Sequence, residues 1–156
     1  MIRIVGLGSP FGDDRVGWRV IELLRGRLPD HIDLVALDRP GAALVNWMQG
    51  VDWLLLIDAI SCDCEPGRII RIDPAQPVAG LSAISSHGLD LAHSFKLAAA
   101  LGSRPARIDL FGIAMNSLDG AELDPGVAAA AGRLARTLQE MMAAAPAPGR
   151  PADRSR

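Results

Sequence analysis

The run WLLLIDA at residues 53–59 constrains the fold more than any other segment, because it is apolar almost throughout. A strand with one face in solvent alternates apolar and polar residues, whereas a strand covered on both faces is apolar along its whole length. Strands of the second kind belong to parallel sheets, in which crossover helices cover both faces. The run therefore predicts an interior strand of a layered α/β domain.

The segments on either side of this run alternate between strand and helix periodicity. Short runs of apolar and β-branched residues predict four further strands, at 2–7, 32–37, 67–73 and 106–113, the third of them an edge strand. Apolar residues recur with helical spacing from about residue 14, then over 41–50, 88–101 and 125–143. This order predicts a single three-layer α/β domain, with a largely parallel, twisted sheet of about five strands and helices on both faces.

The chain length allows one such domain and no more. Its 156 residues, 49% of them hydrophobic, are enough for one well-buried core and too few for two ordinary domains. We expect the domain to cover residues 1–144. Residues 145–156 contain several prolines and no apolar period, and we expect them to form a disordered tail.

The charge and the apolar runs exclude several classes of partner. The net charge of −2 comes from nearly balanced acidic and basic residues, which leave no broad basic surface for nucleic acid or anionic lipid. The sequence has neither a secretory signal nor an apolar run of the roughly 20 residues that cross a bilayer. We therefore expect a cytoplasmic protein without membrane or nucleic-acid partners. Cys62 and Cys64 should be free thiols, because their spacing places them poorly for a bridge.

Acidic residues gather where the predicted parallel strands end, which is where such sheets bind ligands. Asp13 and Asp14 follow the first strand, Asp38 follows the second, and Asp58 ends the third, while His87 lies in a loop that reaches the same edge. Helix capping would explain Asp13, a turn would explain Asp38, and a loop position would explain His87. Asp58 is harder to explain in this way, because a carboxylate next to a buried strand needs a partner to offset its desolvation.

The glycine-rich loop after the first strand poses a question about its ligand. Gly6, Gly8 and Gly12 form a spacing variant of the dinucleotide-binding fingerprint, and the following helix N-terminus attracts anions. However, Asp13 and Asp14 bring negative charge to that position and would repel a pyrophosphate. A cation suits the loop better than a phosphate.

Three segments, in this order and at these intervals, resemble a known family. They are GLGSPFGDDRVGWRVIELL, LLLIDAI and ISSHGLDLA, and the resemblance covers about residues 2–142. The chain resembles the hydrogenase maturation endopeptidases, which trim the large subunit of nickel-iron hydrogenases. The resemblance implies that Asp14, Asp58 and His87 bind metal and carry catalysis. The first of these is often glutamate in relatives, so Asp14 implies a shorter ligand arm.

The same resemblance implies the substrate and its metal. The family removes a C-terminal extension from a hydrogenase large-subunit precursor after nickel insertion, with the nickel supplied by the precursor and no organic cofactor. We expect a monomer, and whether the metal or a carboxylate activates the attacking water stays open. Many members follow the second-strand aspartate with two glycines and a threonine, whereas here Asp38 precedes Arg39 and a proline. Asp38 and Arg39 are therefore candidates for substrate recognition, with an altered preference around the cut.

Two other functions stay open at this point. In the first, the chain is a non-enzymatic metal-binding or chaperone module, and Cys62 and Cys64 donate soft thiolate ligands beside Asp58. In the second, it is a nucleotide-binding α/β enzyme that uses the glycine loop.

Overall fold

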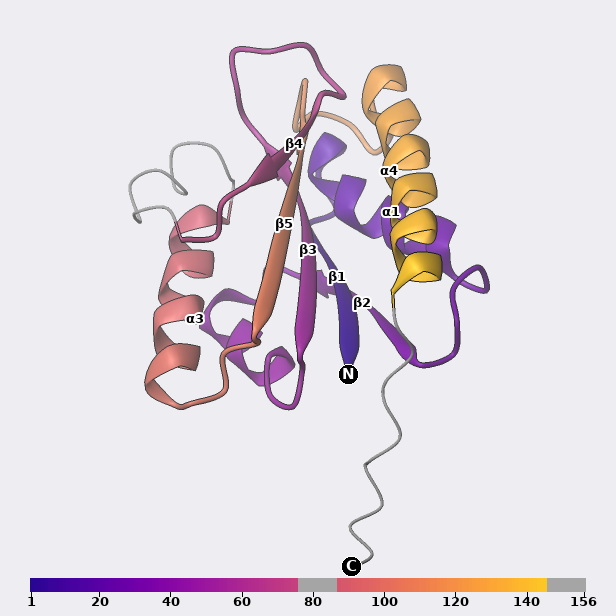
Figure 1. Cartoon of the computed structure of the whole chain (residues 1–156). Helices are drawn as coiled ribbons and strands as arrows, with labels where there is room; N and C mark the ends of the chain where they lie inside the picture. The colour runs from indigo at the N-terminus through magenta and orange to yellow at the C-terminus, as the bar shows by residue number, and fades with distance from the viewer. Residues whose placement is uncertain (76–86, 146–156) are drawn as a thin grey trace, which may run out of the picture.

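A computed structural model describes residues 1–75 and 87–145 and contains a five-stranded, twisted sheet between helical layers (Figure 1). Its strands are β1 (Ile2–Gly8), β2 (Ile32–Asp38), β3 (Trp53–Ile60), β4 (Ile69–Ile72) and β5 (Arg107–Ala114). They lie in the order β2-β1-β3-β5-β4, and β1, β2, β3 and β5 run parallel. β4 pairs antiparallel with β5 at the edge. This arrangement confirms the predicted α/β class and the predicted edge strand.

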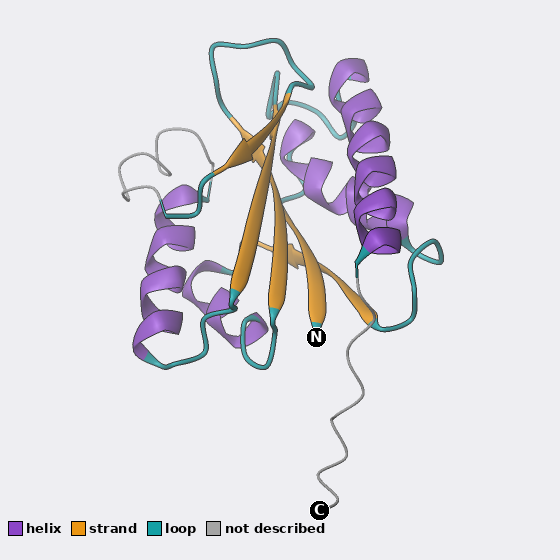
Figure 2. Ribbon diagram, in the orientation of Figure 1, coloured by secondary structure: helices purple, strands orange, loops and turns teal. Residues whose placement is uncertain are grey.

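Helices cover both faces of the sheet (Figure 2). α1 (Val16–Leu24) and α4 (Pro125–Ala144) lie together on one face, while α3 (Gly88–Ala100) packs with a 3₁₀ helix, η2 (Gly41–Trp47), on the other. Each face has its own apolar cluster of buried side chains. The molecule is therefore three layers deep.

The position of β3 confirms the interior strand that its apolar run predicted. Leu55 and Ile57 pack into the core beneath α1 and α4, whereas Leu54 and Leu56 pack into the core on the α3 side. All four side chains are fully buried. The strand is apolar along its length because both of its faces are interior.

Glycine allows α1 to approach β1 very closely. A Cβ atom at Gly6 would lie 2.3 Å from the carbonyl oxygen of Gly17, and a Cβ at Gly17 would lie 2.3 Å from that of Leu7. Neither distance is possible for a real side chain, so both positions require glycine. The approach holds a short 3₁₀ helix, η1 (Gly12–Arg15), directly at the carboxyl end of β1. The glycines of this loop thus serve helix–strand packing.

The strand order places a topological switch point between β1 and β3. The chain leaves β1 to form β2 on one side and later forms β3 on the other. Crossovers on opposite sides leave a crevice at the carboxyl ends of these two strands, where α/β sheets bind their ligands. η1 and the end of β3 both lie at this crevice.

The structure differs from one sequence-based expectation, since it pairs Cys62 with Cys64 as a disulfide. The chain bends at Asp63 and Cys64, which brings the two Cα atoms to 5.3 Å, within the range of disulfide-bonded residues. The prediction of free thiols, which rested on the spacing of the two cysteines, is wrong for this structure.

Two further expectations concern the C-terminal tail and membrane-spanning helices. α4 ends at Ala144, and of the expected tail at 145–156 all but residue 145 lies outside the described residues. Among the described helices, we find none with the length and apolar character that crossing a bilayer requires.

Candidate metal and active site

Asp58 is the most deeply buried of the predicted site residues. It lies within β3, two residues before the strand ends at Ile60, and its side chain is fully buried. Its Oδ1 atom is 2.8 Å from Nδ1 of His87, which provides the partner that a buried carboxylate needs. The sequence analysis placed Asp58 at the end of the strand, whereas the structure places it inside β3.

His87 lies at the N-terminal end of α3, in a half-buried position between two carboxylates. Nδ1 faces Asp58, and Nε2 lies 3.9 Å from Oδ2 of Asp14. Burial, the largest influence, lowers the pKa of this imidazole. The hydrogen bond to Asp58 and the negative charges of Asp58, Asp14 and Asp90 together outweigh burial, so the pKa is raised above its usual value.

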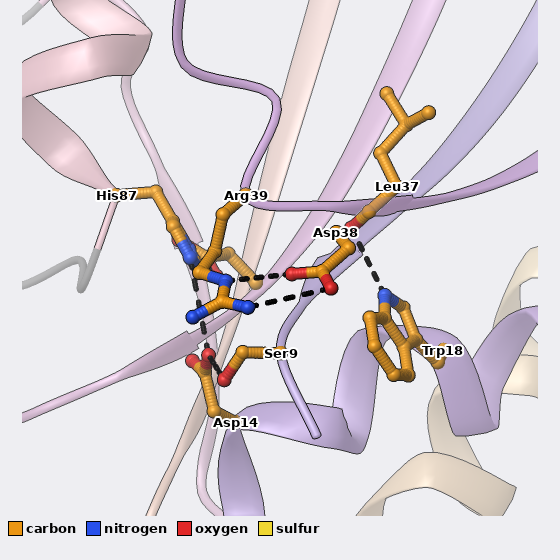
Figure 3. Close-up of polar contacts among 8 residues, drawn as sticks. Ser9, Asp14, Trp18, Leu37, Asp38, Arg39 and His87 are labelled. Atoms are coloured by element: carbon orange, nitrogen blue, oxygen red, sulfur yellow. Dashed lines mark hydrogen bonds and ion pairs between the residues drawn. The ribbon is translucent and has the colours of Figure 1, made fainter. Parts of the chain in front are cut away.

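Asp14 completes the cluster from the first loop. It belongs to η1 and is 5% exposed, and its Oδ2 atom accepts a hydrogen bond from the hydroxyl of Ser9 (Figure 3). Asp14, Asp58 and His87 each offer one ligand atom, and these atoms lie within 4.8 Å of one another. The structure therefore brings together three side chains that are as many as 73 positions apart, as the sequence predicted.

This set of donors has the chemistry of a divalent metal site. Two carboxylates and one imidazole suit a first-row divalent ion, and three ligands leave positions of its coordination shell for a substrate. In this structure, the contact between Oδ1 of Asp58 and Nδ1 of His87 fixes the orientation of the imidazole ring.

Comparison with known proteins identifies the family. The profile of the hydrogenase maturation protease family matches residues 18–141, well over half of the chain. The chain belongs to this family. The match confirms the family resemblance seen in the sequence. The matched region includes β3 and the start of α3.

Individual relatives agree with this assignment. The hydrogenase expression/formation protein HoxM of Azotobacter vinelandii is 32% identical over 123 residues, covering 76% of this chain and 59% of its own length. HupM of Azotobacter chroococcum is 30% identical over 149 residues, covering 86% and 71%. The hydrogenase 2 maturation protease of Escherichia coli is 30% identical over 123 residues, covering 76% and 75%. The matched part of the chain thus spans about three fifths of the first of these relatives.

Solved structures of the family share the fold. The hydrogenase maturating endopeptidase HybD from E. coli superimposes with a TM-score of 0.73 at 26% identity, covering 90% of this chain and 93% of that one. The [NiFe] hydrogenase maturation protease HybD from Thermococcus kodakarensis gives 0.75 at 25% identity, covering 90% and 98%. The α/β architecture is therefore that of the family.

Asp13 has a role that sequence analysis missed. No side chain caps η1 or α1, so the predicted helix cap is wrong. Instead, the buried Asp13 carboxylate accepts hydrogen bonds from the backbone N–H groups of Asn116, Ser117 and Asp124, at 2.8, 3.0 and 2.8 Å. Asp13 therefore fastens the loop after β5 to the loop after β1. Its donors lie more than 100 positions away, so no local pattern could indicate them.

Asp38 and Arg39 lie beside the cluster rather than within it. Arg39 has a left-handed backbone, with φ of 41°, and its Nε atom donates to Oδ1 of Asp38 at 2.6 Å. The guanidinium group points toward His87 and Asp14, as Figure 3 shows, and Arg39 lines the same pocket as these two residues. Trp18 steadies this segment by donating to the carbonyl oxygen of Leu37 at 2.9 Å.

Proposed function

We propose that this protein is an endopeptidase that removes the C-terminal extension of a nickel-iron hydrogenase large-subunit precursor. Membership of the hydrogenase maturation protease family supports this function. The observation that carries it is the convergence of Asp14, Asp58 and His87 at the topological switch point of the sheet. Such a cluster on a rigid scaffold can hold a metal and a peptide bond in fixed geometry.

Nickel enters this proposal as part of the substrate. The precursor holds it through its own cysteines, and Asp14, Asp58 and His87 complete the coordination, so that cleavage follows only when nickel has been inserted. An ion bound in this way would fix the nearby peptide bond and polarise its carbonyl group. No organic cofactor is required.

The three side chains have different access to such a substrate. Asp14 and His87 line a pocket of about 520 Å³ together with Ser9, whereas Asp58 lies behind the imidazole. We therefore assign Asp14 and His87 to direct contact with the precursor. Asp58 holds the imidazole through its contact with Nδ1 and adds its carboxylate to the nickel shell once the precursor is seated.

Asp38 and Arg39 are proposed to recognise the precursor around the cut. The ion pair between them holds the Arg39 guanidinium at the mouth of the pocket, where it can contact backbone carbonyls or acidic side chains of the substrate. We also propose that the protein acts as a monomer in the cytoplasm, with Asp14, Asp58 and His87 all supplied by the one chain.

Cleavage of purified precursor with and without nickel tests this function. The wild-type protein should cut the nickel-loaded precursor and leave the nickel-free form intact. His87→Ala should cut neither form while keeping its fold, as judged by circular dichroism. Equal processing of both forms by the wild type would reject nickel gating, and failure to cut either form would reject the peptidase function.

The two alternatives have less support in the structure. Cys62 and Cys64 are paired with each other, and neither belongs to the metal-binding group found among the described residues. The glycine loop is occupied by helix–strand packing and by the carboxylates of Asp13 and Asp14, which disfavours a nucleotide phosphate.

A further inference from the structure

Two large apolar side chains stand exposed at the mouth of the proposed active site. Phe11 is 54% exposed and Leu118 is 52% exposed, and both line the pocket that contains Asp14 and His87. Most large apolar side chains of the described residues are buried in the two cores. Exposed apolar groups that share one pocket with polar groups are typical of a binding site.

The two side chains come from distant loops that are firmly joined. Gly12 donates its N–H to the carbonyl oxygen of Gly120 at 2.9 Å, and Asp13 donates to that of Ser117 at 2.9 Å. The Asp13 carboxylate adds its three bonds to the same loop. Gly12 and Asp13 directly follow Phe11, and Ser117 and Gly120 lie on either side of Leu118, so the relative position of the two loops is fixed before any substrate arrives.

Glycine at position 12 permits this contact. Its φ is +49°, and a Cβ there would lie 2.6 Å from the carbonyl oxygen of Ser117 and from the carbonyl carbon of Leu118. A side chain at this position would push the two loops apart. The backbone of Gly12 thus brings the Leu118 loop against the Phe11 loop.

Arg39 closes the third side of the pocket mouth. Its guanidinium carbon lies 5.7 Å from the centre of the Phe11 ring, within cation–π range. Because Asp38 holds the guanidinium, this contact restrains the Phe11 ring as well. The two apolar side chains therefore line the pocket together with the polar side chains of Ser9, Asp14, His87 and Asp90.

We propose that Phe11 and Leu118 form an apolar clamp that seats one apolar side chain of the precursor, within a few residues of the scissile bond. This inference rests on the proposed function. The occupant is a residue of the precursor peptide, because the clamp lines the same pocket as Asp14 and His87, which the proposed function assigns to the precursor. The clamp supplies binding energy equally before and during reaction, so its loss raises KM and leaves kcat unchanged.

Kinetics with the nickel-loaded precursor of the source organism test the clamp. Phe11→Ala and Leu118→Ala should each raise KM about threefold, and the double variant about tenfold, with kcat within twofold of wild type. Leu101→Ala is the matched control, because Leu101 is an exposed leucine that does not line the pocket. It should leave both constants unchanged. Leu118→Ser provides a second truncation should one alanine variant fold poorly.

A substrate scan identifies the occupant. Apolar precursor residues next to the cut are replaced by alanine one at a time and assayed with the wild type and with Leu118→Ala. One replacement should raise KM for the wild type and have little further effect on Leu118→Ala. Unchanged KM in the double protein variant, or additive effects for every precursor residue, would overturn the clamp while leaving the peptidase function intact. A wild type that leaves the precursor uncut would overturn both.

Discussion

Two buried aspartates lie on neighbouring strands at opposite ends of the sheet, and their partners differ in kind. Asp109, near the start of β5, is 3% exposed and accepts hydrogen bonds from Arg71, from Arg107 at 2.8 Å and from the indole N–H of Trp53 at 2.7 Å. Asp58, near the end of β3, faces the imidazole of His87. Arginine is permanently charged, whereas histidine can lose its proton and bind a metal.

This difference separates a structural carboxylate from a functional one. The guanidinium groups neutralise Asp109 at every physiological pH, and Arg107 also stacks on the Trp53 ring at 3.8 Å. Asp58 and Asp14 share a partner whose charge depends on pH and ligands. Burial alone therefore does not indicate function, because the chemistry of the partner decides between the two roles.

The largest expected effect is on cleavage, at the Asp58 end. Asp58→Asn should lower the rate of precursor cleavage by about two orders of magnitude or more, because the imidazole loses the charge that orients it. Asparagine preserves the volume of this fully buried side chain, so no cavity forms. Single-turnover cleavage of the nickel-loaded precursor measures the rate. Asp109→Asn is the control and should cleave at the wild-type rate; equal losses in both variants would break the distinction.

The second effect is on stability, at the other end of the sheet. Asp109→Ala should lower the free energy of unfolding by about 2–3 kcal/mol, because it removes a charge-assisted network and leaves two arginines facing a buried gap. Both arginines are more than half exposed, so water limits the loss. Urea denaturation measures the change. An Asp109→Ala protein as stable as the wild type would contradict the structural role.

Asp13 is expected to affect stability and cleavage together. Asp13→Asn replaces one accepting oxygen by an NH₂ group that faces backbone donors, which should cost about 1–2 kcal/mol. The loosened loop should also raise KM a few-fold, since it carries Leu118. Asp30→Asn, at an exposed position, serves as the control for loss of one carboxylate. Denaturation and steady-state kinetics on both variants would show whether the effect is specific to Asp13.

The smallest effect is the pH dependence of stability. A histidine whose pKa is raised by folding binds its proton more tightly in the native state. Its contribution is therefore fully present below the pKa of the unfolded chain, about 6.5, and is lost as pH rises through the higher native pKa. The metal-free wild type should lose a little stability over this interval. His87→Gln should lack this loss, and an identical pH profile for both proteins would contradict the raised pKa.

The sequence predicted the layers and the edge strand because these depend on local patterns. The apolar run of β3 and the helical spacing of α1 and α4 each reflect burial of their own segment. The pairing of Cys62 with Cys64 has no such local signal.

The site was predictable only in part. Strand ends indicated Asp14 and Asp58, the loop before a predicted helix indicated His87, and the family resemblance grouped the three, but their mutual distances follow from the strand order. Asp13 could not be assigned, because its three donors lie in a loop beyond β5. Long-range backbone contacts of this kind leave no periodic trace in the sequence.

The central claim is that Asp14, Asp58 and His87 hold nickel together. Crystals of the protein soaked in nickel and measured at the nickel absorption edge test this claim directly. The account predicts one anomalous peak within about 2.5 Å of a ligand atom from each of the three side chains, and its loss in His87→Ala. A peak at Cys62 and Cys64 instead, or a peak that survives in His87→Ala, would contradict it.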